Sequence, residues 1–149
     1  MAWHEGTYAC GHTGRVQIYG PVKDREWKEK KEFSRLCPDC RKKKFYEDNL
    51  KAVQTAKEMG LPELTGTEKQ VAWANAIRLN VIGDMYKDRL EFLLSERKPE
   101  LHDQIKSGME QIRNYIIKNK TDASYFIDRR DYTFTDFINE IGRELGWTK

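Results

Sequence analysis

The spacing of three cysteines and one histidine constrains this chain more than any other feature of its sequence. Cys37 and Cys40 are separated by two residues, and His12 follows Cys10 after a single intervening residue. Structural zinc sites bind Zn²⁺ through four tetrahedral Cys or His ligands, which usually come from two close pairs joined by a loop. The sequence therefore predicts one structural zinc ion per chain, bound by Cys10, His12, Cys37 and Cys40.

Two alternatives to this ligand set stay open from the sequence. His4 is close enough along the chain to replace His12 as the fourth ligand, and the C-x-H pair departs from the C-x-x-C pair of an ordinary zinc ribbon. The other alternative is that the cysteines are ordinary free or buried thiols. That interpretation leaves unexplained why all three fall in two short turn-like segments between residues 10 and 40.

The predicted ligand set also bears on catalysis, because four protein ligands leave no position on zinc for a reactive water. A zinc deaminase needs H-x-E and P-C-x-x-C, whereas here Glu5 directly follows His4 and Pro38 lies between the two cysteines of the second pair. The sequence has no phosphate-binding loop, nucleophile elbow or H-E-x-x-H motif. We therefore expect the protein not to be an enzyme.

A small module with β-structure is predicted around these ligands. Aromatic and β-branched residues flank the glycine-containing turn after Cys10, so residues 3–19 are expected to form a β-hairpin. Residues 23–34 are densely charged, and the sequence leaves open whether they form a loop or a short exposed helix. Together with the second cysteine pair, these segments define a zinc-ribbon-like module over residues 1–46.

The rest of the chain is predicted to be helical. A helical segment over residues 41–59 stops at a Gly-Leu-Pro sequence, and residues 47–60 are expected to connect the module to a helical domain over residues 61–149. That domain is predicted to contain amphipathic helices over residues 67–94, 99–119 and 134–145. The first of these begins at a capping box formed by Thr67 and Gln70. The expected fold is α+β, with a zinc ribbon followed by a bundle of three or four helices.

Positive charge is concentrated in the predicted module. Residues 1–46 contain 11 Lys and Arg against 6 Asp and Glu, a net charge of +5; the chain totals of 27 and 24 leave 16 against 18, or −2, for the remainder. Basic side chains interleaved with aromatic ones can combine phosphate contacts with base stacking. The acidic residues dilute this field, so a solvated charged face is the alternative. The candidate contacts are Lys28, Lys30, Lys31, Arg41, Lys42, Lys43 and Lys44.

Two stretches in the predicted helical domain are also distinctive. Residues 65–78 combine the capping box with a tryptophan and basic side chains, and residues 125–130 are an aromatic cluster that runs into two arginines. Candidate contacts with nucleic acid or a protein partner in these stretches are Lys69, Trp73, Arg78, Arg129 and Arg130. Structural roles compete with this interpretation, because Trp73 suits a helix core and Asp128 can form an ion pair with a neighbouring arginine.

These stretches and the two cysteine pairs resemble small uncharacterised proteins of bacteria, phages and mobile elements that combine an N-terminal zinc ribbon with a helical region. The resemblance is carried by residues 64–74 continuing to Ile77 and Arg78, and by residues 123–131 with their aromatic-Ile-Asp-x-Arg core. It implies the two-part organisation and a mobile-element source, and it implies no activity.

Two functions are consistent with these features. The first is a non-catalytic accessory protein that binds nucleic acid through its basic, aromatic-containing N-terminal module. The second is a protein-interaction module, such as a phage or mobile-element inhibitor of a host defence complex. No apolar stretch approaches the roughly 20 residues that span a bilayer, and the N-terminus lacks the apolar core of a signal peptide. We therefore expect no membrane association and a cytoplasmic location, where reduced thiols can bind metal.

Overall fold

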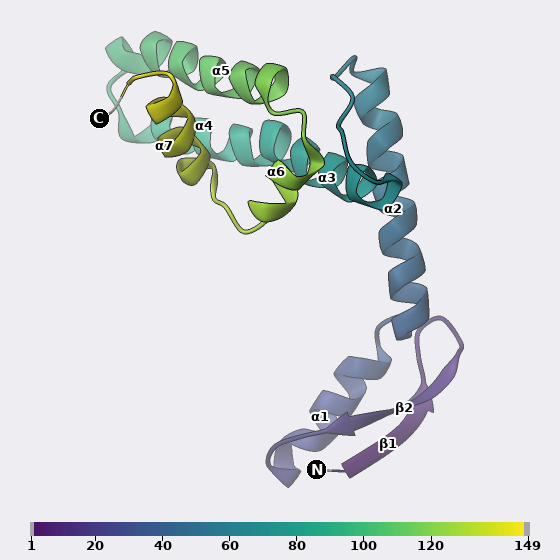
Figure 1. The fold of residues 1–149 in the computed structure, drawn as a ribbon. Coiled ribbons are helices and arrows are strands. Elements are labelled where there is room, and N and C mark those ends of the chain that lie inside the picture. Colours follow the sequence, from purple (N-terminus) through teal and green to yellow (C-terminus); the bar gives the residue numbers. More distant parts are fainter. Residues whose placement is uncertain (1, 148–149) are drawn as a thin grey trace. The chain divides into compact units, whose positions relative to one another are not determined.

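The computed structural model describes residues 2–147, and the chain divides after Glu47 into two compact units (Figure 1). The first unit contains a two-stranded antiparallel hairpin and a short helix, and the second is helical. The chain is therefore α+β, as the sequence predicts. Among the described residues, no helix combines the length and the apolar character needed to cross a bilayer.

The hairpin of the first unit consists of β1 (Ala2–Thr7) and β2 (Thr13–Ile18). In their register Trp3 lies opposite Gln17 and Gly6 lies opposite Gly14. Because side chains alternate between the two faces of a strand, Trp3 and Gln17 share one face and the two glycines share the other. A methyl group on Gly6 would come within 2.8 Å of the Phe33 ring, so this glycine leaves the space into which the next helix packs.

The densely charged segment after the hairpin is a helix, α1 (Val22–Phe33). It packs on the hairpin face that carries the two glycines, and the rings of Phe33 and Tyr8 lie 4.9 Å apart. The next helix, α2 (Pro38–Glu58), begins three residues before the predicted start at Arg41. Residues 47–60, which were predicted as a connecting helix, thus belong mostly to a helix that starts between the cysteines of the second pair.

The second unit contains the predicted amphipathic helices. Its elements are α3 (Glu68–Asn80), the π-helical turn η1 (Val81–Met85), α4 (Tyr86–Glu96), the 3₁₀ turn η2 (Pro99–Leu101), α5 (His102–Asn119), α6 (Ala123–Asp128) and α7 (Phe134–Glu144). The predicted capping box is present, because the Thr67 side chain accepts from the Gln70 backbone N–H and the Gln70 side chain accepts from the Thr67 backbone N–H.

The core of the second unit is formed by the apolar faces of α3, η1, α5, α6 and α7. Ile116, Phe126, Phe137 and Ile141 are 0% exposed, and they come from three successive helices. Burial of side chains of this size contributes about 1.5–3 kcal/mol each. The predicted apolar stripes of α5 and α7 are therefore confirmed as core faces.

A short backbone bridge joins the two distinctive stretches of the second unit. The N–H of Thr65 donates to the carbonyl of Thr121 at 2.8 Å, and the N–H of Ala123 donates to the carbonyl of Thr65 at 2.9 Å. Gly66 follows at φ +145°, and a methyl group there would lie 3.1 Å from the Ala123 side chain. A glycine is needed at this position because the two segments approach so closely.

Candidate metal centre and the adjacent groove

The four predicted ligands come together at one end of the first unit. One donor atom from each of Cys10, His12, Cys37 and Cys40 lies within 4.8 Å of all the others. Cys37 is buried, Cys10 and Cys40 are half-buried, and His12 is exposed. These residues therefore lie close enough to bind a single metal ion. His4 is not one of the group, because its Nδ1 lies 2.9 Å from a carboxylate oxygen of Glu29 on α1.

The distances within the cluster match a tetrahedral metal site. The Nδ1 atom of His12 lies 3.3 Å from Sγ of Cys10, 3.6 Å from Sγ of Cys37 and 3.3 Å from Sγ of Cys40. Zn–S bonds of about 2.3 Å and Zn–N bonds of about 2.0 Å in a tetrahedron separate nitrogen and sulfur by roughly 3.5 Å. A single imidazole nitrogen thus faces three sulfurs at a spacing consistent with one bound metal ion.

The backbone around the ligands holds the two pairs against each other. The N–H of Ala9 donates to the carbonyl of Arg35 at 2.9 Å, and the N–H of Cys37 lies 3.4 Å from Sγ of Cys10. Within the second pair, the N–H of Cys40 lies 3.4 Å from Sγ of Cys37 at the start of α2. Gly11 makes the first turn possible with a φ of +85°. The site is therefore built largely by local turns and by hydrogen bonds to sulfur.

Hydrogen bonds and nearby charges give the thiols of the cluster different pKa values. Backbone N–H groups of Cys37 and His12 lower the pKa of Cys10 to about 6. The hydrogen bond from the Cys40 thiol to Cys37, together with burial and the nearby Cys10, raises the pKa of Cys40 to about 11. Three thiols this close cannot all ionise without strong repulsion, and a bound cation removes that repulsion. The donor set therefore fits a divalent metal ion.

A groove lies in the first unit along β2 and α1, and none of the four candidate metal ligands lines it. It encloses about 690 Å³ and presents aromatic and basic side chains together. Trp3, Tyr19 and Trp27 are 56%, 60% and 62% exposed. The cations that line the groove are Arg15, Lys28, Lys31 and Arg35, and the carboxylate that lines it is Glu32. Four positive charges against one negative charge favour an anionic ligand.

The predicted basic residues of the first unit divide between the groove and its surroundings. Lys28 and Lys31 line the groove. Lys30 instead forms an exposed ion pair with Glu26 at 2.9 Å, and this pair raises the pKa of Lys30. Arg41 lies 3.4 Å from Glu32.

The basic run at the start of α2 does not form a single row. Lys42, Lys43 and Lys44 are exposed on successive positions of the helix. Successive residues of an α-helix point about 100° apart, so these three side chains cannot all face one strand of phosphates.

Five aromatic and basic residues of the groove were missing from the predicted binding set: Trp3, Arg15, Tyr19, Trp27 and Arg35. The guanidinium carbon of Arg15 lies 4.6 Å from the ring centroid of Trp3, on the hairpin face that points away from α1. Alternation along the strand was the available signal, since Trp3 and Glu5 on β1 share a face with Arg15 and Gln17 on β2. Using that signal required the hairpin register, which the sequence did not define.

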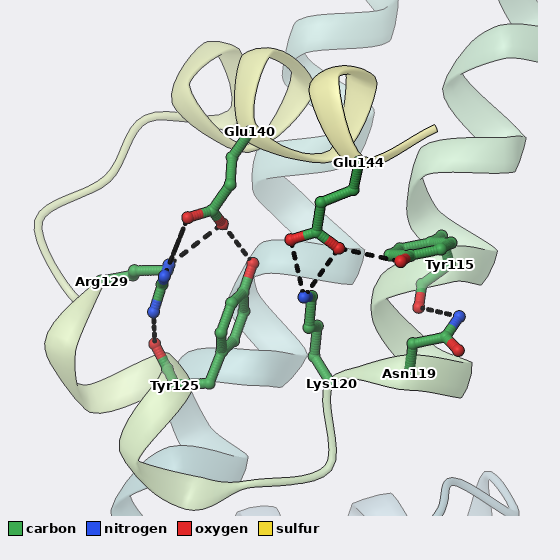
Figure 2. Close-up of polar contacts among 7 residues, drawn as sticks. All are labelled: Tyr115, Asn119, Lys120, Tyr125, Arg129, Glu140 and Glu144. Carbon is green, nitrogen blue, oxygen red and sulfur yellow. Dashed lines mark hydrogen bonds and ion pairs between the residues drawn. The ribbon is translucent and has the colours of Figure 1, made fainter. Parts of the chain in front are cut away.

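Some of the predicted contact residues of the second unit are exposed, and others interact with side chains of the same unit. Lys69 is exposed on the first turn of α3. The guanidinium carbon of Arg130 lies 5.8 Å from the ring centroid of Trp73, which links the two distinctive stretches. Arg129 forms an ion pair with Glu140 of α7 at 2.8 Å, as Figure 2 shows. This pair ties α6 to α7.

Arg78 occupies a different environment from the other four candidates. It is 1% exposed, so its guanidinium group is not available to a partner at the surface. Its Nη1 donates to the carbonyl of Pro62 at 2.7 Å, and its Nη2 donates to Oδ1 of Asn75 at 2.5 Å. These bonds attach the segment that precedes α3 to the helix itself.

No family model, curated protein or solved structure matches this chain. The resemblance to proteins of mobile elements therefore stays a prediction, and the site is interpreted from its own geometry.

Proposed function

We propose that this protein is a non-catalytic, zinc-stabilised accessory protein that binds nucleic acid through its N-terminal unit. The observation that carries the proposal is the groove along β2 and α1, where three exposed aromatic rings lie among four cations and one carboxylate. Phosphate contacts supply most of the affinity of nucleic-acid binding, and aromatic rings add stacking on bases. The metal would act structurally, because its four positions are filled by protein ligands.

The identity of the metal is proposed from the chemistry of the donors. Three sulfurs and one imidazole nitrogen are a common ligand set for structural zinc. We place this centre in a zinc ribbon, with one knuckle formed by the hairpin turn and the other at the start of α2. Its role is to fix β2 and α1 beside each other, so that the groove keeps its shape.

A fluorescence-anisotropy titration tests the proposal. Zinc-loaded protein is titrated into labelled DNA and RNA oligonucleotides at roughly 50 and 200 mM salt. We expect binding that weakens steeply with salt, because counterions are released from the phosphates. Replacing Lys28, Lys31 and Arg35 together by Gln should reduce the slope of log K against log salt by roughly 2, for three contacts at about 0.7 each on a single strand.

A variant with the same change in charge provides the control. Replacing Lys42, Lys43 and Lys44 by Gln removes three positive charges outside the groove, and it should have a smaller effect on affinity. Equal losses in the two triple variants would indicate a diffuse charge effect and not a site. The absence of any binding at low salt would contradict the proposal.

A protein-interaction role is the second candidate, and exposed apolar side chains on the second unit favour it. Phe92 and Leu101 are 51% and 44% exposed. Apolar surface of this kind can mark a docking site for another protein, such as a host defence complex targeted by a phage or mobile-element inhibitor. This role predicts a partner complex that survives nuclease treatment and is weakened by Phe92→Ser.

A further inference from the structure

We infer that the groove selects single-stranded nucleic acid over duplex by stacking unpaired bases on Trp3 and Trp27. This inference rests on the proposed function and specifies its ligand. It is carried by the pairing of each exposed indole with a cation: Arg15 lies 4.6 Å from the ring centroid of Trp3, and Lys31 lies 4.9 Å from that of Trp27. Each cation lies over one face of its ring, so a base on the other face and a phosphate on the cation would use both groups at once.

The exposure of the two indoles indicates a ligand with flat faces. Trp3 and Trp27 are 56% and 62% exposed, although large aromatic side chains are usually covered in a folded unit. Within a duplex, the faces of the bases are covered by their neighbours in the stack, and only edges and phosphates are accessible. A single strand offers unpaired bases whose faces can stack on aromatic rings. The exposed rings therefore match the chemistry of a single strand.

The charge pattern of α1 disfavours a duplex. Inserting this helix into the major groove would bring its four carboxylates, at Asp24, Glu26, Glu29 and Glu32, between two rows of phosphates. The cations of the groove instead line a single hollow: Lys28 and Lys31 on α1, Arg35 just beyond its end, and Arg15 on β2. Such an arrangement suits one phosphate backbone better than two.

The inference also predicts little sequence preference. The cations of the groove are assigned to phosphates, and Gln17 already accepts a hydrogen bond from the Tyr19 hydroxyl at 2.6 Å. Stacking on an indole tolerates every base because each base has a π-face. The groove should therefore bind unpaired strands of different sequence with similar affinity.

A comparison of single-strand and duplex affinities for the zinc-loaded full chain tests this inference. A labelled oligothymidine and a blunt duplex of equal length are titrated separately at low salt, and intrinsic tryptophan fluorescence is recorded. We expect the single strand to bind at least tenfold more tightly and to quench the fluorescence. Trp27→Ala and Trp3→Ala should each weaken single-strand binding by roughly tenfold while leaving the weaker duplex binding unchanged.

Trp147→Ala is the matched control, because Trp147 is 47% exposed and lies in the second unit. That variant should bind the single strand like the wild type. Amide spectra of Trp3→Ala and Trp27→Ala should keep the wild-type pattern away from the substituted side chains, which separates lost stacking from lost folding. Duplex binding as tight as single-strand binding, or unchanged affinity in both groove variants, would overturn the inference and leave the proposed function standing. Failure to bind any nucleic acid would overturn both.

Discussion

Arg78 illustrates how a single side chain can organise a segment of this protein. Its guanidinium group is buried without a carboxylate within 4.0 Å among the described residues, and burial lowers its pKa. The charge is solvated instead by the carbonyl of Pro62 and by the side chain of Asn75. Asn75 is itself held by a hydrogen bond from its Nδ2 to the carbonyl of Val71 at 2.9 Å. The guanidinium group of Arg78 thus links the segment before α3 to Asn75 on the helix, and Asn75 is bonded to the preceding helical turn.

We expect Arg78→Lys to lower the free energy of unfolding by about 2–3 kcal/mol, because a single ammonium group cannot reach both acceptors. Urea unfolding followed by circular dichroism measures the change. Arg143→Lys, at an exposed position on α7, is the control and should change stability by less than about 0.5 kcal/mol. A similarly small effect of Arg78→Lys would show that the two hydrogen bonds contribute little.

At the residue scale, the sequence was sufficient to predict the cluster of three cysteines and one histidine, and it was insufficient to predict the groove. The spacing of Cys37 and Cys40, and of Cys10 and His12, is local, so it could be interpreted without knowing the fold. Arg78 was interpreted as a possible contact because the core side of the helix had been assigned to Val71, Ala74 and Ile77. Its position four residues after the buried Ala74 places it on the inner face of α3, and the pattern of charge alone did not reveal this.

At the scale of elements, α7 is attached to the rest of the second unit by two carboxylates one helical turn apart (Figure 2). Glu140 accepts from the Tyr125 hydroxyl at 2.6 Å and from Nε of Arg129 at 2.9 Å. Glu144 accepts from Nζ of Lys120 at 2.8 Å and from the Tyr115 hydroxyl at 2.8 Å. The apolar side chains of α7 are buried in the core. The hydrogen bonds and ion pairs of Glu140 and Glu144 fix the rotation of this helix against α5 and α6.

The Glu140 contacts make stability depend on pH. Burial by itself would raise the pKa of Glu140, but the hydrogen bonds from Arg129 and Tyr125 and the positive charge of Arg129 lower it below its ordinary value of 4.5. Because the pKa is lower in the folded state, the added stability is present above pH 4.5 and is lost as the pH falls through the folded-state pKa. Acid should therefore loosen the attachment of α7.

We expect Glu140→Gln to lower the free energy of unfolding at neutral pH by about 1–2 kcal/mol, because a neutral amide accepts more weakly from the guanidinium group. The difference from the wild type should shrink as the pH falls from 5 to 3, since the wild-type carboxylate is then protonated. Urea titrations across that pH range measure it. Glu110→Gln, at an exposed position on α5, should give no pH-dependent difference. A constant difference at every pH would contradict the role of the charge.

Some helices could be predicted from the sequence, and others could not. The apolar positions of α5 and α7 recur at helical spacing, so both helices could be recognised from the sequence. The helix α1 stayed ambiguous because Val22, Trp27 and Phe33 do not form a continuous apolar stripe. It is defined by its packing on the hairpin, where Phe33 fills the space above Gly6. Such a contact between segments leaves no periodic signal in the sequence.

At the scale of the whole molecule, the two units differ in how they are stabilised. Among the described residues of the first unit, only Tyr8, Ile18 and Cys37 are buried apolar side chains. The second unit has a continuous core that includes Ile112, Phe126 and the apolar face of α7. A core of three side chains is too small to fold a module by itself, so we expect the metal to supply the missing stability. Structural zinc contributes on the order of 10 kcal/mol in small peptides.

Metal removal should therefore unfold one unit and spare the other. Protein purified without added zinc should contain about one zinc ion per chain. A chelator should abolish amide protection in β1, β2 and α1 while leaving protection in α5 and α7, as followed by hydrogen exchange. Cys37→Ser should give the same result without chelator. Full metal occupancy in a variant that carries both Cys37→Ser and Cys40→Ser would contradict the ligand assignment.

The bridge between Thr65 and Asp122 has a consequence for the order in which the second unit folds. It joins positions that are more than fifty residues apart, and ordering so long a loop has an entropic cost that only later contacts offset. The helices α4 and α5 are neighbours along the chain and can pair early. The docking of α6 on α3 must then close the loop, so we expect it to be a late step, after which the segments on either side of the bridge unfold only together.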